Sequence, residues 1–511
     1  MIINRSRKEL MTKSAILCTS DKIQLICVFL FGILSWTLYC GNFIWDDSYF
    51  YLVIARNIIR TGHQTFSNIF PTNGFHPLWL YLLTAYSFIV TMVHPALLLH
   101  EAYAIPLAAG IIAWGAFNFW KVADLLDLPK IPVVGLPLCY LLFFQVLYSE
   151  AHLLYAALSC LTLIACNTKW KHSKRSYIAG LVCALVFLSR LDSVFIIICY
   201  LVWHITITHK ISDVIRFLAA FLAAVSPYLI SNIVFFGGLV PMSGWIKSSF
   251  PNIFLSKTVS WNCLLGYNVF AGVIPIVVSA VIVCSIKTSS TRIKQIIYIY
   301  LFGSILHLLY TILYTRFHTL YWWYYVPHII LIALSIGLFF KERPLPTMFT
   351  TICNALIIAL VCCCLVLFRW QTVLIHNEQN PITKLLDYMR QAGIEGKSIF
   401  VSEIPGIIAF YSANNIIAAD MVTANRNLFD AMINTPNAIT YLFDYCKNTG
   451  KPIQYYLHMG SGFIELNKDG TAITYNNPKL YPVIKPIGTF NFGHKPEYVS
   501  WLTICNLWRL I

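Results

Sequence analysis

Residues 45–79 read WDDSYFYLVIARNIIRTGHQTFSNIFPTNGFHPLW, and this stretch decides how the rest of the chain is interpreted. Between Tyr49 and Ile59 apolar residues recur at helical spacing, which predicts an amphipathic helix lying on a bilayer surface. Asp46 and Asp47 stand at the start of that helix, directly after an apolar stretch at 23–45. Carboxylates are costly in hydrocarbon, so we expect this pair at the boundary between lipid and water.

The composition excludes an ordinary soluble enzyme. Of the 511 residues, 58% are hydrophobic and only 11% are charged, and the mean hydropathy is +0.69. A soluble globular domain carries roughly 25% charged residues. The chain is therefore interpreted as a membrane protein.

Apolar stretches long enough to cross the bilayer recur along the first 370 residues. They lie near 23–45, 97–120, 131–149, 151–168, 177–190, 192–208, 214–236, 262–286, 295–315, 319–340 and 347–368. The stretch 77–93 is shorter, and a crossing there would break the parity of the topology, so we interpret it as interfacial or re-entrant. The predicted fold class is a polytopic α-helical membrane protein with about 11–13 membrane segments and a C-terminal α/β extracytoplasmic domain.

The basic residues predict the orientation. The net charge is +15, and most of the excess falls in residues 1–22 and in short basic turns such as 169–175. Lys and Arg concentrate in cytoplasmic loops, so these segments are assigned to the cytoplasm and the C-terminal domain to the periplasm of a bacterial inner membrane. The excess then reports orientation and calls for no nucleic-acid partner.

Three domains follow from this reading. A cytoplasmic N-terminus spans 1–22, a transmembrane domain spans 23–368 with an outward loop at 46–76, and an α/β domain spans 369–511. In the last, strand-like runs at Ser398–Val401 and Ile416–Ala419 alternate with a helical stretch at Leu428–Asn448. Pairing of Cys446 with Cys505 is left open.

Further polar residues fall in turns on the same predicted side as the aspartate pair. They are Arg56, His76, Glu150, His152, Arg190, Asp192, Lys247, Arg316 and His318, with an aromatic run at 321–325. Carboxylates, cations and imidazoles converging on one face suit a substrate that carries both phosphate and sugar.

Each of these features has a plainer alternative. The aspartate pair can cap a helix, Arg190 and Asp192 can neutralise each other at a helix end, and Glu150 can belong to a solvated turn. The aromatic run is more typical of an interfacial belt than of a sugar-stacking platform.

Several of these segments resemble the GT-C membrane glycosyltransferases, and more closely a group of bacterial GT-C-like proteins. The resemblance rests on WDDSYFYLVIARNIIRTGH and PTNGFHPLW, then on the Glu150 turn, LSRLD at 188–192, VPMSGWIK at 240–247 and RFHTLYWWYY. It continues in SEIPGIIAFYSANNIIAADMVTAN at 402–425. The Glu150 turn and ADMVTAN depart from the group's usual pattern.

The resemblance implies an enzyme that moves a sugar, a hexose or a pentose, from a polyprenyl-phosphate donor to an acceptor hydroxyl of a glycan, lipid or protein. It implies Asp46 as the leading general base with Asp47 as its partner, although a shift of one position exchanges them. His76 would shape the acceptor side, and Arg190, Lys247 and Arg316 would contact the donor phosphate. Arg56, Glu150, Asp192 and His318 complete the predicted substrate-binding set. No cofactor is certain; a divalent cation is possible, and its ligands are unknown.

Two other classes of function stay open. The many spans and the charges at their ends also suit a transporter or flippase of a lipid-linked or anionic solute, although transporter sites usually lie near the bilayer midplane in repeated halves. A non-catalytic assembly or receptor subunit would instead use its C-terminal domain as the working surface.

Overall fold

The computed structural model describes most of the chain between Asp46 and Leu510. The described residues are 46–143, 150–167, 170–253, 268–286, 291–315, 322–343, 386–387, 389–391, 393–401, 405–418, 421–434, 438–458, 465–466, 472–473, 484–491 and 504–510. The predicted spans at 23–45 and 347–368 lie outside these residues.

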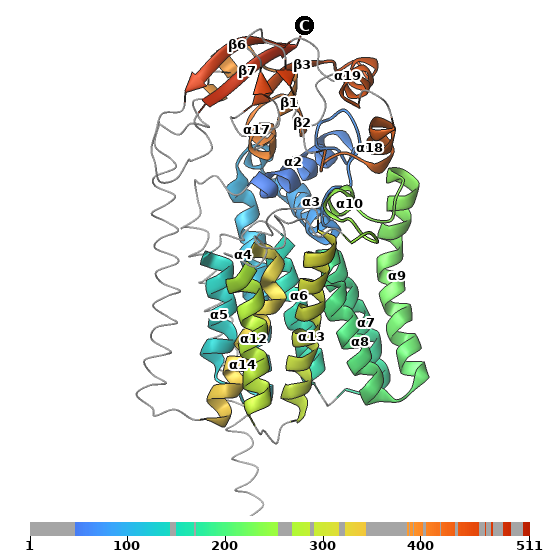
Figure 1. Ribbon diagram of the computed structural model, residues 1–511, viewed down its shortest axis with the longest axis vertical. Coiled ribbons are helices and arrows are strands. Elements are labelled where there is room, and N and C mark those ends of the chain that lie inside the picture. The colour runs from blue at the N-terminus through green and yellow to red at the C-terminus, as the bar shows by residue number, and fades with distance from the viewer. Residues whose placement is uncertain are drawn as a thin grey trace, which may run out of the picture.

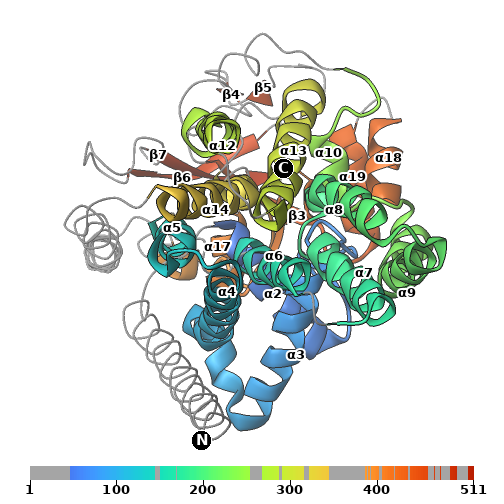
Figure 2. The same ribbon diagram turned by 90° about the horizontal axis from the view of Figure 1, so that it is seen from below.

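A bundle of helices forms the body of the molecule (Figure 1). Its helices are α4 (Ile105–Leu126), α5 (Lys130–Phe143), α6 (Glu150–Cys166), α7 (His172–Ser189), α8 (Val194–Thr208), α9 (Ile211–Phe236), α12 (Ile274–Ser285), α13 (Thr291–Tyr314) and α14 (Val326–Glu342). They correspond to nine of the eleven predicted spans. Seen from below, most of them appear nearly end-on (Figure 2).

The outer surface of the bundle is apolar. On α9 the exposed side chains include Ile215, Leu222, Ile230 and Phe235, a surface that water would not favour and lipid would. Among the described residues, five helices are long and apolar enough to cross a membrane, and four shorter apolar helices accompany them. The chain is thus a polytopic helical membrane protein, as the composition predicts.

Two helices lie across one end of this bundle. They are α2 (Asp46–Thr61) and α3 (Pro77–Val93), joined by the loop 62–76. Figure 2 shows α3 lengthwise where the bundle helices are seen end-on. Its exposed apolar side chains include Phe88, Ile89 and Met92, in agreement with the interpretation of 77–93 as interfacial.

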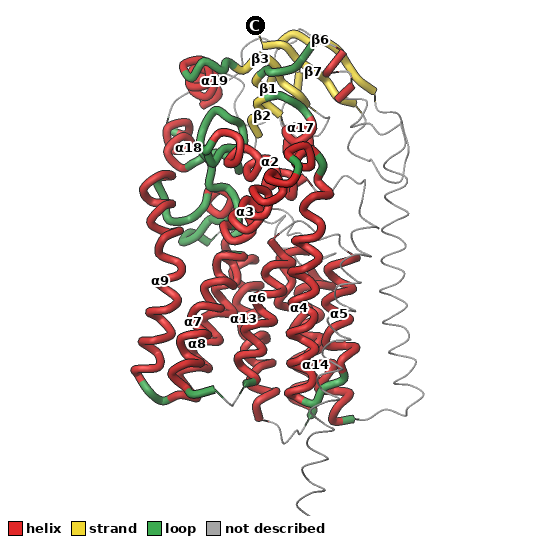
Figure 3. Tube along the Cα trace, turned by 180° about the vertical axis from the view of Figure 1, so that it is seen from behind, coloured by secondary structure: helices red, strands yellow, loops and turns green. Residues whose placement is uncertain are grey.

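The prediction that α2 lies on an open bilayer surface is wrong. Tyr49, Leu52, Val53 and Ile54 point in different directions around the helix, yet each is no more than 2% exposed. The bundle side covers one face of α2 and the C-terminal region covers the other (Figure 3). An apolar stripe read from sequence does not say whether lipid or protein will cover it.

The C-terminal region is an α/β fold above α2. Its five-stranded sheet has the order β2-β1-β3-β7-β6. The strands are β1 (Ser398–Val401), β2 (Asn415–Ala418), β3 (Ile453–His458), β6 (Ile484–Asn491) and β7 (Ile504–Leu510), and β4 (Glu465–Leu466) pairs with β5 (Ala472–Ile473). β1 is parallel to β2 and β3, while β7 is antiparallel to β3 and β6.

Three helices connect the parallel strands. α17 (Pro405–Tyr411) joins β1 to β2, and α18 (Arg426–Ile433) and α19 (Ala438–Asn448) precede β3. All four residues of β1 are buried, as expected of a central strand covered on both faces. The sequence predicts one helical stretch at Leu428–Asn448, and the structure has two helices there, α18 and α19. The Asn425 side chain caps the first of them by accepting the backbone N–H of Leu428.

One hydrophobic core joins the α/β fold to the membrane domain. Tyr49 and Leu52 of α2 and Trp79 of α3 pack in the same buried cluster as Ile399 of β1 and Ile408 of α17. A second cluster joins the loop and α10 (Met242–Lys247) to α18 and α19. The sheet is thus packed directly against α2, α3 and their loop.

The opposite end of the bundle carries basic turns. The helix ends and turns there hold Lys121, Lys130, Lys171, Lys174, Arg175, Lys210, Arg216, Arg292, Lys294, Lys341 and Arg343. Acidic residues partner some of them, as Asp124 does Lys130 at 2.7 Å.

Candidate active site

The aspartate pair opens α2, where carboxylates favour the positive end of the helix dipole. The two side chains differ in their surroundings. Oδ1 of Asp46 accepts the backbone N–H of Ile407 in α17 at 2.8 Å. Asp47 is exposed. The structure thus separates two residues that the sequence leaves interchangeable.

A buried cluster of charges lies at the end of the bundle nearest α2. Its centre is Arg190, which follows α7 and is 1% exposed. Nη1 of Arg190 donates to Oε1 of Glu150 at 2.7 Å, and Nε and Nη2 donate to the two oxygens of Asp192 at 3.0 and 2.9 Å. His307 of α13 places Nε2 3.5 Å from Oδ2 of Asp192. We call Tyr51, His76, Glu150, Arg190, Asp192 and His307 the Arg190 cluster.

The fork geometry of Arg190 explains why it occupies this position. A guanidinium presents several N–H donors in a plane, so it can bind two carboxylates at once where an ammonium cannot. Its plane also lies over the ring of Tyr324, 4.2 Å from the centroid. The alternative in which Arg190 neutralises Asp192 is thus confirmed, and Glu150, only 6% exposed, does not belong to a solvated turn.

Tyr51 of α2 and His76 at the end of the loop complete the Arg190 cluster. The Tyr51 hydroxyl donates to Oε2 of Glu150 at 3.1 Å and accepts the backbone N–H of His76 at 3.3 Å. Burial and the nearby Glu150 carboxylate raise the pKa of Tyr51, so its hydroxyl stays a donor. Nε2 of His76 lies 3.7 Å from Oε1 of Glu150. Burial lowers the pKa of His76 to about 4 despite that carboxylate, so the ring is neutral at pH 7.

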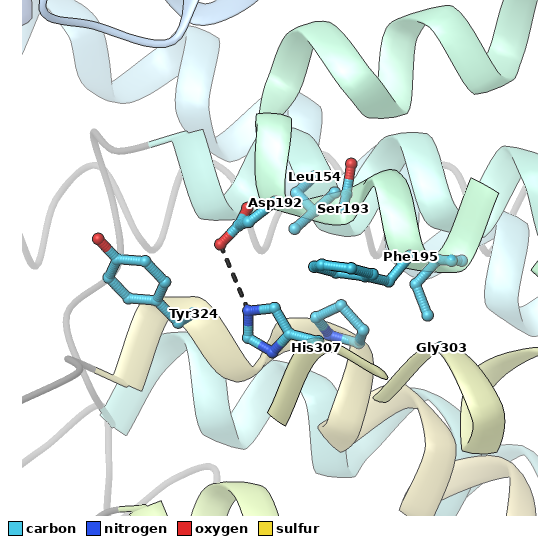
Figure 4. Close-up of a pocket in the computed structure, with 9 residues that line it drawn as sticks. Leu154, Asp192, Ser193, Phe195, Gly303, His307 and Tyr324 are labelled. Atoms are coloured by element: carbon cyan, nitrogen blue, oxygen red, sulfur yellow. Dashed lines mark ion pairs between the residues drawn. The ribbon is translucent and has the colours of Figure 1, made fainter. Parts of the chain in front are cut away.

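A small pocket adjoins the Arg190 cluster between α6, α8, α13 and α14 (Figure 4). Figure 4 shows Asp192 and His307 facing each other across it, with Phe195 and Tyr324 beside them. Its lining residues are Leu154, Asp192, Ser193, Phe195, Ile196, Gly303, His307, Tyr324 and Pro327. One carboxylate and one imidazole thus meet an otherwise mainly apolar wall.

Arg56 lies away from this cluster. Its Nη1 and Nη2 donate to the carbonyls of Phe410 and Ala409 at the end of α17, both at 2.9 Å, and the guanidinium packs over the Phe410 ring. Burial lowers the pKa of Arg56 to about 10, which leaves it charged at pH 7. In this arrangement Arg56 fastens α17 to α2.

The segment 71–74 connects the α/β fold to the bundle. Asn73 donates to Oδ1 of Asn232 at the end of α9 and accepts the N–H of Met242 at the start of α10, both at 3.3 Å. Asn425 donates to the carbonyl of Pro71 at 2.9 Å. A methyl group on Gly74 would stand 1.7 Å from the carbonyl oxygen of Val422, so only glycine permits this approach. PTNG, VPMSGW and residues 421–425 of ADMVTAN, which are far apart in the sequence, meet here.

The remaining predicted site residues divide into two groups. Lys247 ends α10 and is half-buried, and its charge contributes to lowering the pKa of His76. Arg316 and His318 lie outside the described residues. Of the aromatic run, Trp322, Trp323 and Tyr325 are buried in the 3-10 turn directly before α14, so these three rings do not form an exposed interfacial belt.

The sequence leaves open a bound metal ion and a disulfide between Cys446 and Cys505. In the part of the chain that the structure describes, no group of three or more His, Cys, Asp or Glu side chains stands ready to hold a metal ion. Glu150 and Asp192 each accept hydrogen bonds from Arg190, which occupy oxygen lone pairs that a metal ion would otherwise use. Cys446 is a buried free thiol in α19, and the side chain of Cys505 lies outside the described residues.

Sequence reasoning missed three members of the site. Tyr51 has no predicted role within its motif, Tyr324 belongs to the predicted aromatic belt, and His307 lies inside an apolar span. An ionisable residue within a span is itself a functional signal, so His307 could have been found from sequence. The hydrogen bond from Tyr51 to Glu150 joins residues 99 positions apart and left no local pattern.

Comparison with known proteins identifies the fold. No family model matches the sequence, and no curated protein matches it. Among solved structures, the chain is similar to ArnT from Cupriavidus metallidurans bound to undecaprenyl phosphate, with a TM-score of 0.51 and 10% identity over 94% of this chain and 97% of that one.

Two further structures are similar at lower TM-scores. The mycobacterial arabinofuranosyltransferase AftD gives 0.48 at 12% identity, covering 96% of this chain, which spans only 40% of AftD. The Archaeoglobus fulgidus oligosaccharyltransferase, in complex with Zn and sulfate, gives 0.41 at 13% identity over 84% of this chain and 67% of that one.

The chain therefore has the fold of ArnT, which belongs to the GT-C membrane glycosyltransferases. The fold class expected from the sequence is confirmed, with the helical membrane domain followed by a small sheet that is parallel in its first part. At 10% identity the likeness to ArnT concerns the fold alone.

Proposed function

We propose that this protein is a GT-C glycosyltransferase that moves a sugar from a polyprenyl-phosphate donor to an acceptor hydroxyl. The observation that carries the proposal is the position of the Asp46–Asp47 pair. It opens a helix that lies across the end of a GT-C-type bundle, beside the Arg190 cluster and under the α/β fold. There a carboxylate can reach a water-borne acceptor while a lipid-anchored donor approaches through the bilayer.

The reaction needs one base and a place for the leaving phosphate. A carboxylate of the aspartate pair takes the proton of the acceptor hydroxyl as its oxygen forms a bond to the anomeric carbon. The bond from that carbon to the phosphate oxygen breaks, and polyprenyl phosphate leaves with the electron pair. Attack opposite the leaving group inverts the anomeric centre.

The residues of the Arg190 cluster have distinct proposed roles. Arg190 is already bound to two carboxylates, so we assign it to holding Glu150 and Asp192 in place. Lys247 of α10, whose charge contributes to lowering the pKa of His76, is the candidate cation for the donor phosphate. His76 is neutral at pH 7, so its ring can either donate a hydrogen bond to the hydroxyl of the sugar acceptor or accept one from it.

The proposed orientation places this site in the periplasm of a bacterial inner membrane. The basic turns at the other end of the bundle support it, because Lys and Arg concentrate on the cytoplasmic side. The acceptor is a lipid, a surface polysaccharide or a protein, and the sugar is a hexose or a pentose.

The test uses the full chain purified into lipid nanodiscs. A panel of undecaprenyl-phosphate hexoses and pentoses is offered together with cell-envelope extract as acceptor, and release of undecaprenyl phosphate is measured by mass spectrometry. We expect release from at least one donor and none from the Asp46→Ala/Asp47→Ala double variant.

Two results would contradict the proposal. One is equal release by the double variant. The other is movement of an intact sugar-lipid across sealed vesicles without cleavage, which would instead establish the transporter. Cysteine labelling that places residues 171–174 outside the cell would reverse the orientation.

A further inference from the structure

Helix α17 of the α/β fold is held at both ends by α2. At its start, the backbone N–H of Ile407 donates to Oδ1 of Asp46 at 2.8 Å. At its end, the carbonyls of Ala409 and Phe410 accept from Arg56. The free N–H groups at a helix start favour a carboxylate, and the free carbonyls at its end favour a cation, so each charge of α2 meets the end of α17 that suits it.

The contact at the start of α17 is a backbone contact that excludes a side chain. A methyl group on Gly406 would stand 2.4 Å from the carbonyl oxygen of Asp46, 3.0 Å from its Oδ1 and 3.1 Å from Cβ of Tyr49. The α17 backbone therefore lies directly on the first turn of α2. Tyr411 then continues the contact, with its hydroxyl bound to Glu101 and 3.4 Å from the hydroxyl of Tyr49.

The two aspartates differ in their surroundings. Successive residues of an α-helix point about 100° apart, and α17 lies against Asp46. Asp46 is partly covered, while Asp47 is exposed. A general base must present a lone pair within about 3 Å of the acceptor hydroxyl, and of the two carboxylates the exposed Asp47 is the more accessible to a hydroxyl arriving from water.

Resting on the function proposed above, we infer that Asp47 is the general base and that Asp46 is a positioning residue which docks α17 onto the catalytic helix. The acceptor hydroxyl gives its proton to the Asp47 carboxylate as the glycosidic bond forms and the bond to phosphate breaks. The α/β fold then contributes to catalysis through α17, because its docking fixes the first turn of α2 and with it the direction of Asp47.

Aspartate and asparagine differ as Brønsted bases, but both side chains accept a hydrogen bond from a backbone N–H, so substitution between them separates the two roles. An amide oxygen accepts an N–H about as well as a carboxylate does at a helix start, yet it cannot take a proton from a hydroxyl. We therefore expect Asp46→Asn to keep undecaprenyl-phosphate release within about fivefold of wild type, and Asp46→Ala to lose more. Asp47→Asn should lose roughly 10²- to 10⁴-fold, the usual contribution of a general base, and Asp47→Glu should recover part of that loss.

A second measurement follows the docking itself without any substrate. Amide hydrogen exchange of residues 405–411 reports whether the N–H groups of α17 stay protected. We expect faster exchange in Asp46→Ala and in Arg56→Met, the matched variant at the other end of α17. Exchange at the wild-type rate is expected in Asp46→Asn and in Asp47→Asn.

The outcomes separate this inference from the function on which it rests. If wild-type protein releases no undecaprenyl phosphate from any donor, the proposed function fails, and hydrogen exchange still decides whether Asp46 docks α17. If wild type is active and Asp46→Asn is as inactive as Asp47→Asn, the assignment of roles is overturned. Unchanged exchange in Asp46→Ala would overturn the docking role.

Discussion

Nη1 of Arg190 lies 2.7 Å from Oε1 of Glu150, and both side chains are almost completely buried although they stand 40 positions apart in the chain. The pair joins the turn after α7 to the first residue of α6. Since Arg190 also binds Asp192, one cation compensates two carboxylates in this place. This relationship determines how the Arg190 cluster should respond to mutation.

Removing Arg190 should destabilise the protein strongly. In Arg190→Met the buried carboxylate of Glu150 and the half-buried carboxylate of Asp192 lose their shared partner, and breaking a buried pair from one side costs about 3–5 kcal/mol. The measurement is thermal unfolding followed by tryptophan fluorescence. The control is Arg390→Met, whose ion pair with Asp387 is exposed at 65% and 49% and should contribute less than about 1 kcal/mol. Equal shifts in the two variants would show that Arg190 is not compensating buried charge.

Stability should fall in mild acid because of His76. The pKa of His76 is about 4 in the folded chain against 6.5 for an unperturbed histidine. Between these two pH values His76 is therefore protonated in the unfolded chain and mainly neutral in the folded chain. The contribution of neutral His76 to the free energy of unfolding is complete above pH 6.5 and is lost as the pH falls toward 4. At pH 5 the loss is about 2 kcal/mol.

The check on His76 is a comparison of two pH profiles. The difference in unfolding free energy between pH 7 and pH 5 should be smaller in His76→Gln than in wild type, since glutamine does not titrate. Identical pH profiles for the two proteins would exclude this role for His76.

Adding one methyl group to Gly74 should disturb the contact between the loop and the α/β fold. In Gly74→Ala the new carbon would stand 1.7 Å from the carbonyl oxygen of Val422, and backbone cannot give way as a flexible side chain can. We expect faster proteolysis after residue 386 and a lower melting temperature. Gly110→Ala in α4 is the control, because nothing lies within 4 Å of its new methyl group and alanine favours a helix by about 1 kcal/mol. Similar behaviour of both variants would argue against the close contact.

Lys247 should affect donor binding more than stability. Lys247→Met removes a half-buried cation whose charge influences His76, and we expect the KM for the undecaprenyl-phosphate donor to rise about tenfold, equivalent to about 1.4 kcal/mol. Melting temperature should change little. Lys210→Met removes the same charge at the other end of the bundle and should leave KM unaltered. An unchanged KM in Lys247→Met would remove Lys247 from the phosphate site.

Some of the candidate site could be predicted because its members leave local signals. Arg190 and Asp192 are two positions apart and interrupt a long apolar run, so their pairing is visible in the sequence. Asp46 and Asp47 directly follow an apolar stretch. β1 was predicted at its observed bounds, Ser398–Val401, because a short apolar strand in a polar region is conspicuous.

Other parts depend on contacts between distant segments and were predicted wrongly or not at all. The sequence predicts α2 as a helix, but the apolar stripe of an amphipathic helix is the same whether lipid or a sheet covers it. Arg56 looks like a phosphate ligand by residue type alone. Its actual partners are two backbone carbonyls more than 350 positions away, and a carbonyl has no residue signature.

By itself, the sequence determined that this chain is a polytopic helical membrane protein with an α/β region after its spans, and that its few acidic and basic residues outside the basic turns gather near the same ends of those spans. These are consequences of hydropathy and charge, which act over local windows. Only the tertiary structure decided which charges pair with each other, that α17 takes the carboxylate of Asp46 and leaves Asp47 exposed, and that the α/β fold shares a core with α2. Those outcomes depend on which surfaces meet when the chain packs, because a buried charge or N–H must find its partner wherever the fold brings one within about 3 Å.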